Sequence, residues 1–199
     1  MSADFFDAVY ARAGGDDAEV PWQQAISRRW IGDWLSTYEP AGHRRALVVA
    51  AGLGDDAAAL AALGLDTVAF DHSATAVDWA RSRHPDAAVD WQVADLFASP
   101  ADWLESFDLV VEVFTIQSID PSRQVEAAAA IRSFVGSGGT LVAVALVHGG
   151  RGEPQGPPWP LQPSTLDALL DGHTEVHRRT EVLDGDVSCV LAELIRLPA

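Results

Sequence analysis

The chain contains no lysine, and all 13 of its basic residues are arginine. This absence excludes Schiff-base chemistry on lysine, a Walker-type phosphate-binding lysine and a lysine general base. Acidic residues number 29, which leaves a formal net charge of −16 at pH 7. Because sequence-independent binding to DNA or RNA needs a basic face, we expect no nucleic-acid partner.

Cysteine is nearly absent as well, since the single Cys189 has no internal disulfide partner. A reduced cytoplasmic environment is the simplest interpretation. The longest apolar runs, near Arg45–Leu53 and Thr140–Val147, are far shorter than the roughly 20 residues of a membrane span. The first residues include acids and no apolar segment, unlike a signal peptide. We therefore expect a soluble, cytoplasmic protein with no membrane partner.

Apolar residues are abundant: they make up 48% of the 199 residues, against 21% charged residues, which suffices for the core of one domain. Residues 1–43 are rich in aromatics and predict two helices, Asp4–Ala13 and Pro21–Tyr38, with a Gly-Gly-Asp-Asp break between them. We interpret this segment as a helical cap. Residues 45–148 then form a cofactor-binding core, and residues 149–199 a substrate loop and C-terminal hairpin.

From Arg45 onward, short apolar strands alternate with alanine-rich helical stretches, which is typical of βαβ units and a parallel sheet. The predicted strands are Ala46–Ala51, Thr67–Asp71, Asp90–Val93, Phe107–Val113, Thr140–Val147, Thr174–Leu183 and Val187–Arg196. The predicted helices are Asp56–Leu63, Ala74–His84, Pro100–Glu105, Arg123–Phe134 and Pro163–Asp171. The last two strands are joined by Asp-Gly-Asp, which favours a hairpin. We expect an α/β fold with a doubly wound, mostly parallel seven-stranded sheet, an antiparallel C-terminal hairpin and an N-terminal helical cap.

A glycine turn follows the first strand, in the run Ala50-Ala51-Gly52-Leu53-Gly54-Asp55-Asp56. Glycines let the backbone approach a ligand, and the next helix offers its N-terminal N–H groups. Asp71 ends the second strand, 17 residues after Gly54, where a carboxylate can accept hydrogen bonds from the two hydroxyls of a ribose. In the alternative interpretation the glycines only make a turn, and Asp71 caps the helix that starts near Ser73.

Two classes of nucleoside cofactor fit this pattern. The run from Gly52 through Gly54 to Ala57 also fits the dinucleotide fingerprint with alanine at its third position. The chain has no lysine, and its two tyrosines precede the first strand, which excludes a reductase of the Tyr/Lys type. Other nicotinamide-dependent reductases stay open. After the third strand, Asp95 and Leu96 provide a carboxylate and an apolar neighbour suited to an adenine ring.

These segments, in their order and spacing, resemble the class I S-adenosylmethionine-dependent methyltransferases across roughly residues 45–148. The resemblance implies a Rossmann-like methyltransferase fold, S-adenosyl-L-methionine as cofactor, and cofactor contacts from residues at the strand ends. The residues expected to contact the cofactor are Trp22, Ala50, Gly52, Gly54, Asp71, His72, Asp95, Leu96 and Glu112.

A closer resemblance is to the thiopurine S-methyltransferase and thiol/halide methyltransferase group. It rests on the runs Ala46–Arg81 and Phe107–Ile119, on Pro21-Trp22, and on Gly-Pro-Pro-Trp-Pro-Leu at residues 156–161. In that group the early Pro-Trp pair lies over the bound cofactor. Two departures from the wider family stand out. Alanine replaces the first glycine at Ala50, which is compatible with the turn if its backbone stays in the β region. Val48 replaces an acid that this group also lacks.

Candidates for the chemistry are few. Glu112, at the end of the fourth strand, is predicted either to bind the amino group of the donor or to act as a base. His148, after the fifth strand, is a second weak candidate for the base, while His72 is expected at the ribose edge or in solvent. Asp55 and Asp56 favour the start of a helix electrostatically and are further candidates to receive the ammonium group of the donor. The lack of a convincing acid–base pair favours a soft nucleophile as acceptor, because a thiolate needs no base.

A pocket for a small apolar or aromatic acceptor is predicted from Trp22, Thr115, Gln117 and Trp159. His173 and His177 are four residues apart, but they begin a strand, and we expect no metal site. The sequence therefore predicts a methyltransferase that acts on a small molecule, with sulfur favoured and oxygen or nitrogen behind it. The alternatives are a non-catalytic adenosyl-binding protein that acts by interaction and, behind it, a nicotinamide-dependent reductase.

Overall fold

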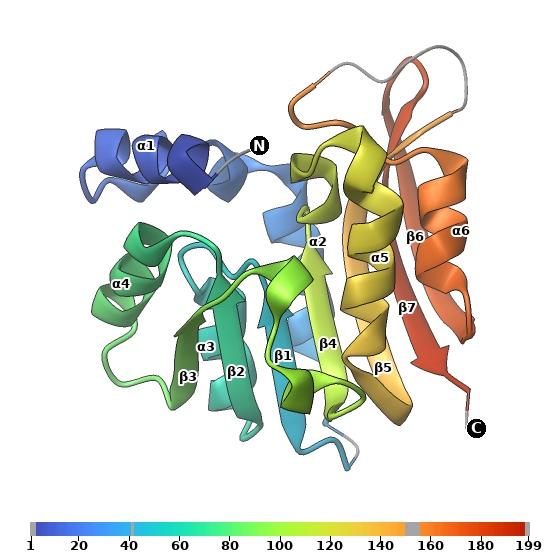
Figure 1. Cartoon of the computed structure of the whole chain (residues 1–199), viewed down its shortest axis with the longest axis horizontal. Helices are drawn as coiled ribbons and strands as arrows, with labels where there is room; N and C mark the ends of the chain where they lie inside the picture. The colour runs from blue at the N-terminus through green and yellow to red at the C-terminus, as the bar shows by residue number, and fades with distance from the viewer. Residues whose placement is uncertain (1–2, 41, 150–155, 198–199) are drawn as a thin grey trace.

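Seven strands form one sheet in the computed structural model, which describes residues 3–40, 42–149 and 156–197 (Figure 1). The order across the sheet is β3-β2-β1-β4-β5-β7-β6. The strands are β1 (Arg45–Val49), β2 (Asp66–Asp71), β3 (Val89–Val93), β4 (Phe107–Val113), β5 (Val135–His148), β6 (His173–Asp184) and β7 (Val187–Arg196). The first five strands pair in parallel, and β7 pairs antiparallel with both β5 and β6. This arrangement confirms the predicted sheet and its C-terminal hairpin.

Helices cover both faces of the sheet (Figure 1). They are α1 (Ala3–Ala13), α2 (Ile26–Thr37), α3 (Asp55–Ala62), α4 (Ala74–Arg83), α5 (Gln124–Ser133) and α6 (Pro163–Leu170). Apolar residues of α2, α3 and α4 pack on one face, and those of α5 and α6 pack on the other. Because both faces are covered, β1 is apolar from Ala46 to Val49 without alternation.

The helical cap differs from the prediction in one respect. Pro21–Gln24 form a 3₁₀ turn, and α2 begins only at Ile26. Between them, Ala25 has an extended backbone with φ −71° and ψ 155°, which interrupts a continuous helix. This break turns Pro21 and Trp22 toward the carboxyl end of the sheet, where both residues line a cavity.

The helix predicted at Pro100–Glu105 is wrong. The segment instead holds one 3₁₀ turn, Ala101–Trp103, and a second such turn, Leu96–Ala98, precedes it. Pro100 has an extended backbone, with ψ 134°, and Glu105 has a positive φ of 53°, so a helix has room for only three residues. The buried ring of Trp103 anchors the segment against the core beside Phe70 and Phe107.

The parallel strands bring four loops to one edge of the sheet, because all five strands end there. The loops follow β1, β2, β3 and β4. Figure 1 shows α1 across the top of the molecule, above α4 and the carboxyl ends of the neighbouring strands. Tyr10 and Ala13 of α1 share a small apolar cluster with Leu53 after β1 and Ala76 of α4. The cap is thereby packed over the loop edge.

The backbone of Ala50 differs from the β conformation under which alanine was expected to be compatible with the turn. Its φ is +49°, in the left-handed region rather than the β region. The chain must reverse here from β1 into α3, and the next residue, Ala51, donates its N–H to the carbonyl of Phe70 at 2.9 Å. An alanine in this region costs about 1 kcal/mol or more relative to its usual conformations. The turn therefore stores strain at the point where the sequence departs from the glycine pattern.

Gly54 is required for packing as well as for conformation. It precedes α3 with φ +83° and is buried. A Cβ at this position would lie 2.4 Å from Cη2 of Trp91 on β3, which is closer than any real contact. Gly54 therefore packs directly against the ring of Trp91, and a side chain at this position would overlap with that ring.

We predict that Gly54→Ala lowers the free energy of unfolding by at least about 2 kcal/mol, because it adds a clash with Trp91 to an unfavourable φ. Gly64→Ala is a matched control, since Gly64 has a similar φ of +88° and no atom within 4 Å of its added Cβ. Urea unfolding of both variants checks this. Equal losses in the two variants would show that the ring of Trp91 moves aside freely.

Candidate functional site

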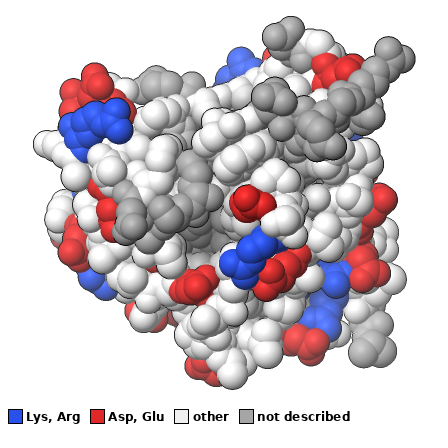
Figure 2. Space-filling view, turned by 45° about the horizontal axis from the view of Figure 1, so that its top comes forward, with Lys and Arg blue, Asp and Glu red and all other residues white. Residues whose placement is uncertain are grey.

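A cavity of about 770 Å³ lies at the loop edge of the sheet, within the range of about 300–1,000 Å³ typical of small-molecule sites. Its wall includes α1, the Pro21–Gln24 turn, the loops after β1 to β4, and the segment at Pro157 and Pro158. Figure 2 shows this end of the molecule, where acidic and basic side chains lie directly beside one another in several places among uncharged ones.

Asp71 joins the first two loops. Its Oδ2 accepts the N–H of Gly52 and its Oδ1 accepts the N–H of Ser73, both at 2.9 Å. Burial raises the pKa of this carboxyl, and the amides of Ser73 and Gly52 offset part of the rise. The cap of α4 is Ser73, whose Oγ accepts the N–H of Ala76. The backbone N–H of His72 also bonds this carboxylate, so at least three of its roughly four lone-pair sites are used within the protein.

Two aromatic rings of the cap form a roof over the glycine turn. The rings of Tyr10 and Trp22 meet edge to face, with centroids 5.4 Å apart. The Oη atom of Tyr10 lies 3.3 Å from where a Cβ on Gly52 would stand, so glycine leaves the space that the roof encloses. Burial raises the pKa of Tyr10, and the phenol is therefore neutral. A hydrogen bond between Asp7 and Ser73 ties α1 to the start of α4.

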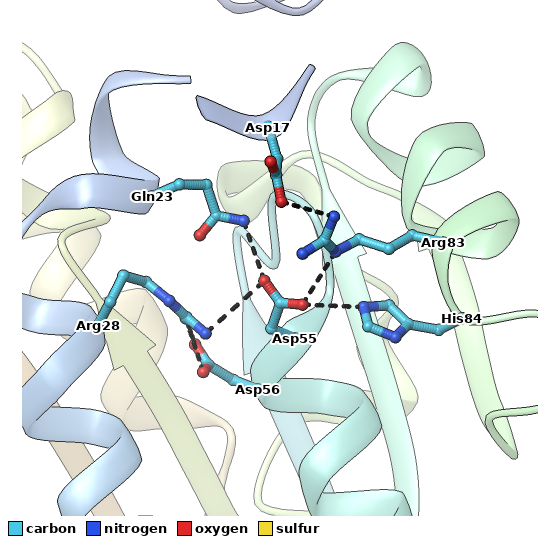
Figure 3. A network of polar contacts seen from close by, with 7 residues as sticks. All are labelled: Asp17, Gln23, Arg28, Asp55, Asp56, Arg83 and His84. Carbon is cyan, nitrogen blue, oxygen red and sulfur yellow. Dashed lines mark hydrogen bonds and ion pairs between the residues drawn. The ribbon is translucent and has the colours of Figure 1, made fainter. Parts of the chain in front are cut away.

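An ion-pair network fixes the cap to the core on the other side of the turn (Figure 3). Its centre is Asp55, whose Oδ2 accepts from Gln23 at 2.9 Å and whose Oδ1 accepts from Arg83 at 3.0 Å. Nε2 of His84 lies 3.2 Å from Oδ1. Burial opposes ionisation of Asp55, but the bonds from Gln23 and Arg83 and the charge of Arg28 outweigh it and lower its pKa.

Arg28 completes the network beside the cavity. Its Nη1 donates to both oxygens of Asp56, at 2.7 and 2.8 Å, and its Nη2 lies 3.7 Å from Asp55. Burial raises the pKa of Asp56, and the charge of Arg28 offsets part of that rise. Arg28, Asp55 and Asp56 all line the cavity. The network leaves the cavity with a guanidinium and two carboxylates at the turn.

The loop after β3 supplies another part of the cavity wall. Asp95 is exposed and accepts the N–H of Phe97 at 2.9 Å, which starts a 3₁₀ turn, while Leu96 is buried. The guanidinium of Arg123 lies 3.5 Å from the centre of the Phe97 ring. All four residues line the cavity.

Glu112 lies outside the cavity wall among the residues that the structure describes. Its side chain is fully buried at the end of β4, and Oε1 accepts the N–H groups of Thr115 and Ile116 at 2.7 and 3.0 Å. Burial raises its pKa to about 7, and the amides of Ile116 and Thr115 oppose this rise. The carboxylate therefore accepts hydrogen bonds from the backbone of the turn that follows β4.

Most of the sequence-predicted site residues do meet at the cavity. They are Trp22, Ala50, Gly52, Gly54, Asp71, His72, Asp95, Leu96, Thr115 and Gln117. Among the described residues, Glu112, His148 and Trp159 are not part of its lining, although Pro157 and Pro158 next to Trp159 are. His148 is buried at the end of β5.

Sequence reasoning predicted Phe114 beside Thr115 and Gln117 but missed other residues of the wall, among them Tyr10 and Arg28. Tyr10 and Arg28 belong to the cap, where no strand end or glycine turn marks them. Phe114 directly follows β4, and its φ of +60° is rare for a bulky residue. The described ranges contain no group of three or more His, Cys, Asp or Glu side chains placed to hold a metal ion. Within those ranges no helix is both long enough and apolar enough to cross a membrane.

Comparison with known proteins identifies the core. Residues 46–139 match the family model described as a methyltransferase domain. This stretch runs from β1 into β5 and includes every loop on which Gly52, Asp71 and Asp95 stand. The match agrees with the methyltransferase core predicted for this part of the chain. No curated protein matches the chain by sequence.

Solved structures share the fold. N-methyltransferase NodS from Bradyrhizobium japonicum WM9, in complex with S-adenosyl-L-homocysteine, superposes with a TM-score of 0.73 at 17% identity, covering 96% of this chain and 98% of that one. Magnesium protoporphyrin IX methyltransferase from Synechocystis PCC 6803, with bound SAM, gives 0.66 at 14% identity over 90% and 82%. The [4+2]-cyclase SpnF gives 0.71 at 16% identity over 89% and 83%. At these identities the likeness shows the Rossmann-like fold.

We predict that Glu112 makes the protein less stable as the pH rises. Its pKa is raised from the usual 4.5 to about 7 in the folded state, so its contribution is fully present below about pH 4.5 and is lost as the pH passes 7. The loss amounts to about 3 kcal/mol. Urea unfolding at pH 5 and pH 8 measures it, with Glu112→Gln as the variant that cannot titrate. The same pH dependence in both proteins would contradict the prediction.

Proposed function

We propose that the methyltransferase domain of residues 46–139 transfers a methyl group from S-adenosylmethionine to a small apolar acceptor, with a thiol favoured. The observation that carries this proposal is the single cavity wall that joins Asp71 and Asp95 to apolar side chains of the cap and of the segment at residues 157–158. The bound donor supplies a methyl group on a sulfonium sulfur. The chain itself aligns the two reactants and excludes water.

The nucleoside half of the donor fits the loops after β2 and β3. Asp71 lines the cavity at the end of β2, where a carboxylate can accept from a ribose hydroxyl, and its backbone bonds hold both oxygens in place. Asp95 and Leu96 offer an acceptor and an apolar face for adenine. The space left by Gly52 under Tyr10, which a Cβ would narrow, supports a ligand that passes close to the turn.

The amino-acid half of the donor is a zwitterion, and the wall beside the turn carries groups of both signs. Among the described contacts, Arg28 donates hydrogen bonds through Nη1 alone, so its other N–H groups are available for a carboxylate. Asp55 and Asp56 are the carboxylates that would receive the ammonium group, in addition to the bonds they accept from Gln23, Arg83 and Arg28. Their pairing with Arg28 holds the three side chains ready before the ligand arrives.

The acceptor end of the cavity is apolar. Phe5, Phe6 and Trp22 of the cap face this space together with residues after β4 and on the far segment, namely Phe114, Ile119, Leu146, Pro157, Pro158 and Leu183. Of the described histidines, only His72 lines the cavity, and it stands next to Asp71 at the donor end. Since no other described histidine lines the cavity, a nucleophile that is reactive without deprotonation by the protein is favoured. A thiol ionises on its own near neutral pH far more readily than an alcohol.

We also propose membership in the thiopurine and thiol/halide methyltransferase group and the three-part division at residues 1–43, 45–148 and 149–199. Two observations support the group. Trp22 lies beside Gly52 in the cavity wall, a position compatible with the place over the cofactor that the resemblance implies, and Pro157 and Pro158 line the same cavity.

The donor site can be tested with two ligands that share the adenosine part. We predict that Asp71→Ala weakens both S-adenosylhomocysteine and 5′-methylthioadenosine at least tenfold, about 1.4 kcal/mol. Arg28→Gln should weaken S-adenosylhomocysteine by a similar factor and leave 5′-methylthioadenosine unchanged, because that ligand lacks the amino-acid part. Titration calorimetry gives both dissociation constants.

Matched controls are available on the same elements. Asp66 begins β2 at the opposite edge of the sheet, and the exposed Arg29 pairs with Glu181, so Asp66→Ala and Arg29→Gln should leave both affinities unchanged. Thermal unfolding without ligand checks that each variant folds. Loss of 5′-methylthioadenosine binding in Arg28→Gln would place the guanidinium elsewhere on the ligand.

The acceptor class is tested with thiophenol, phenol and aniline as matched acceptors and S-adenosylmethionine labelled in its methyl group. We predict that kcat/KM for thiophenol exceeds that for phenol by at least a hundredfold at pH 7.5. Faster transfer to phenol or aniline would overturn the preference for sulfur. Binding of S-adenosylhomocysteine without turnover of any acceptor would favour the alternative of a non-catalytic adenosyl-binding protein.

A further inference from the structure

Glu112 is the most deeply buried carboxylate near the cavity, and the donor and acceptor groups proposed above make no use of it. Its side chain is 0% exposed. Oε1 accepts the N–H groups of both Thr115 and Ile116, while Oε2 has no hydrogen-bond partner among the residues that the structure describes. A buried polar atom without a partner is costly, so the carboxylate at this position requires an explanation.

The turn that Glu112 binds holds an unfavourable backbone. Phe114 has φ +60°, a conformation in which a bulky side chain is seldom found, and its N–H donates to the carbonyl of Val144 at 2.9 Å. Strain of this kind persists only where surrounding contacts determine the conformation. The two hydrogen bonds to Glu112 fix the residues that directly follow Phe114.

The same turn supports the acceptor wall. Oε1 of Gln117 accepts the N–H of Leu146 at 2.6 Å. The backbone carbonyl of Gln117 accepts the N–H of Trp159 at 2.7 Å. Gln124 donates to the carbonyl of Trp159 at 3.0 Å. The turn after β4 is therefore bonded to β5 and to the segment that carries Pro158, and residues of all three line the cavity.

We propose that Glu112 is a positioning residue, which fixes the turn at Phe114–Gln117 and through it the wall that selects the acceptor. The proposal rests on the proposed function insofar as that wall faces the acceptor. It replaces both roles predicted for Glu112 from the sequence. A base or a ligand for the donor ammonium group must reach the cavity, whereas Oε1 of Glu112 is bonded to backbone on its own side of the turn.

The test compares Glu112→Gln, which keeps an oxygen at the position of Oε1, with Glu112→Met, which fills the space without an acceptor. Thiophenol and labelled S-adenosylmethionine are the substrates. In Glu112→Met we expect the KM for thiophenol to rise at least tenfold, with the dissociation constant of S-adenosylhomocysteine within twofold of wild type. Glu112→Gln should recover the thiophenol KM to within about threefold.

Asp108 supplies a matched control on the same strand. Asp108 stands at the start of β4, at the edge of the sheet opposite the cavity. Its Oδ2 accepts the N–H groups of Arg44 and Arg45 at 2.8 and 2.9 Å. Asp108→Leu removes a comparable pair of bonds, and we expect the thiophenol KM to stay unchanged. A thiophenol KM in Glu112→Met that matches wild type, or a parallel loss of S-adenosylhomocysteine affinity, would overturn the proposal.

Hydrogen exchange separates this proposal from the proposed function. The amides of Thr115 and Ile116 should be protected in wild type and in Glu112→Gln and should exchange faster in Glu112→Met, with protection at Leu109–Val111 unchanged. If wild type fails to methylate thiophenol, the thiol assignment falls, and the exchange pattern decides on Glu112 alone. Unchanged protection in Glu112→Met would then refute the positioning role.

Discussion

The carboxylate of Asp71 is the contact on which the whole loop edge depends. It holds the glycine turn after β1 against the start of α4, and Ser73, which it orients, also bonds Asp7 of α1. The position of the glycine turn, the start of α4 and the packing of α1 therefore all depend on this one carboxylate. Burial makes the ionised form of Asp71 costly, and the amides of Ser73 and Gly52 offset part of that cost. A site arranged in this way is preorganised before any ligand binds.

The sheet and the donor loops could be predicted because local patterns report them directly. Strands buried on both faces are continuous apolar runs, and the chain between them must cross over, so the order of elements implies parallel strands that end at one edge. Gly52, Asp71 and Asp95 each follow such a strand, and all three line the cavity. Their positions follow from topology alone, with no need to know any side-chain contact.

The remaining features of the site depend on contacts between distant residues. Arg28 reaches the cavity only because Ala25 breaks the predicted helix and Asp56 holds the guanidinium, across 28 positions of sequence. Glu112 ends an apolar strand in the way that a catalytic acid would, and only the structure shows that its oxygen serves the backbone. Ala50 takes a glycine-like backbone that its residue type gives no reason to expect. In each case packing overrode a local preference.

Exposure varies along the cavity wall, and this variation sets where the cavity opens to solvent. Gly52, Asp71 and Tyr10 are buried, whereas His72, Asp95, Pro157, Pro158 and Leu183 are exposed. The exposed residues come from segments that lie far apart in the sequence. The shape of the opening therefore depends on how the loops after β2 and β3 and the C-terminal part of the chain pack beside one another, and not on α1 alone.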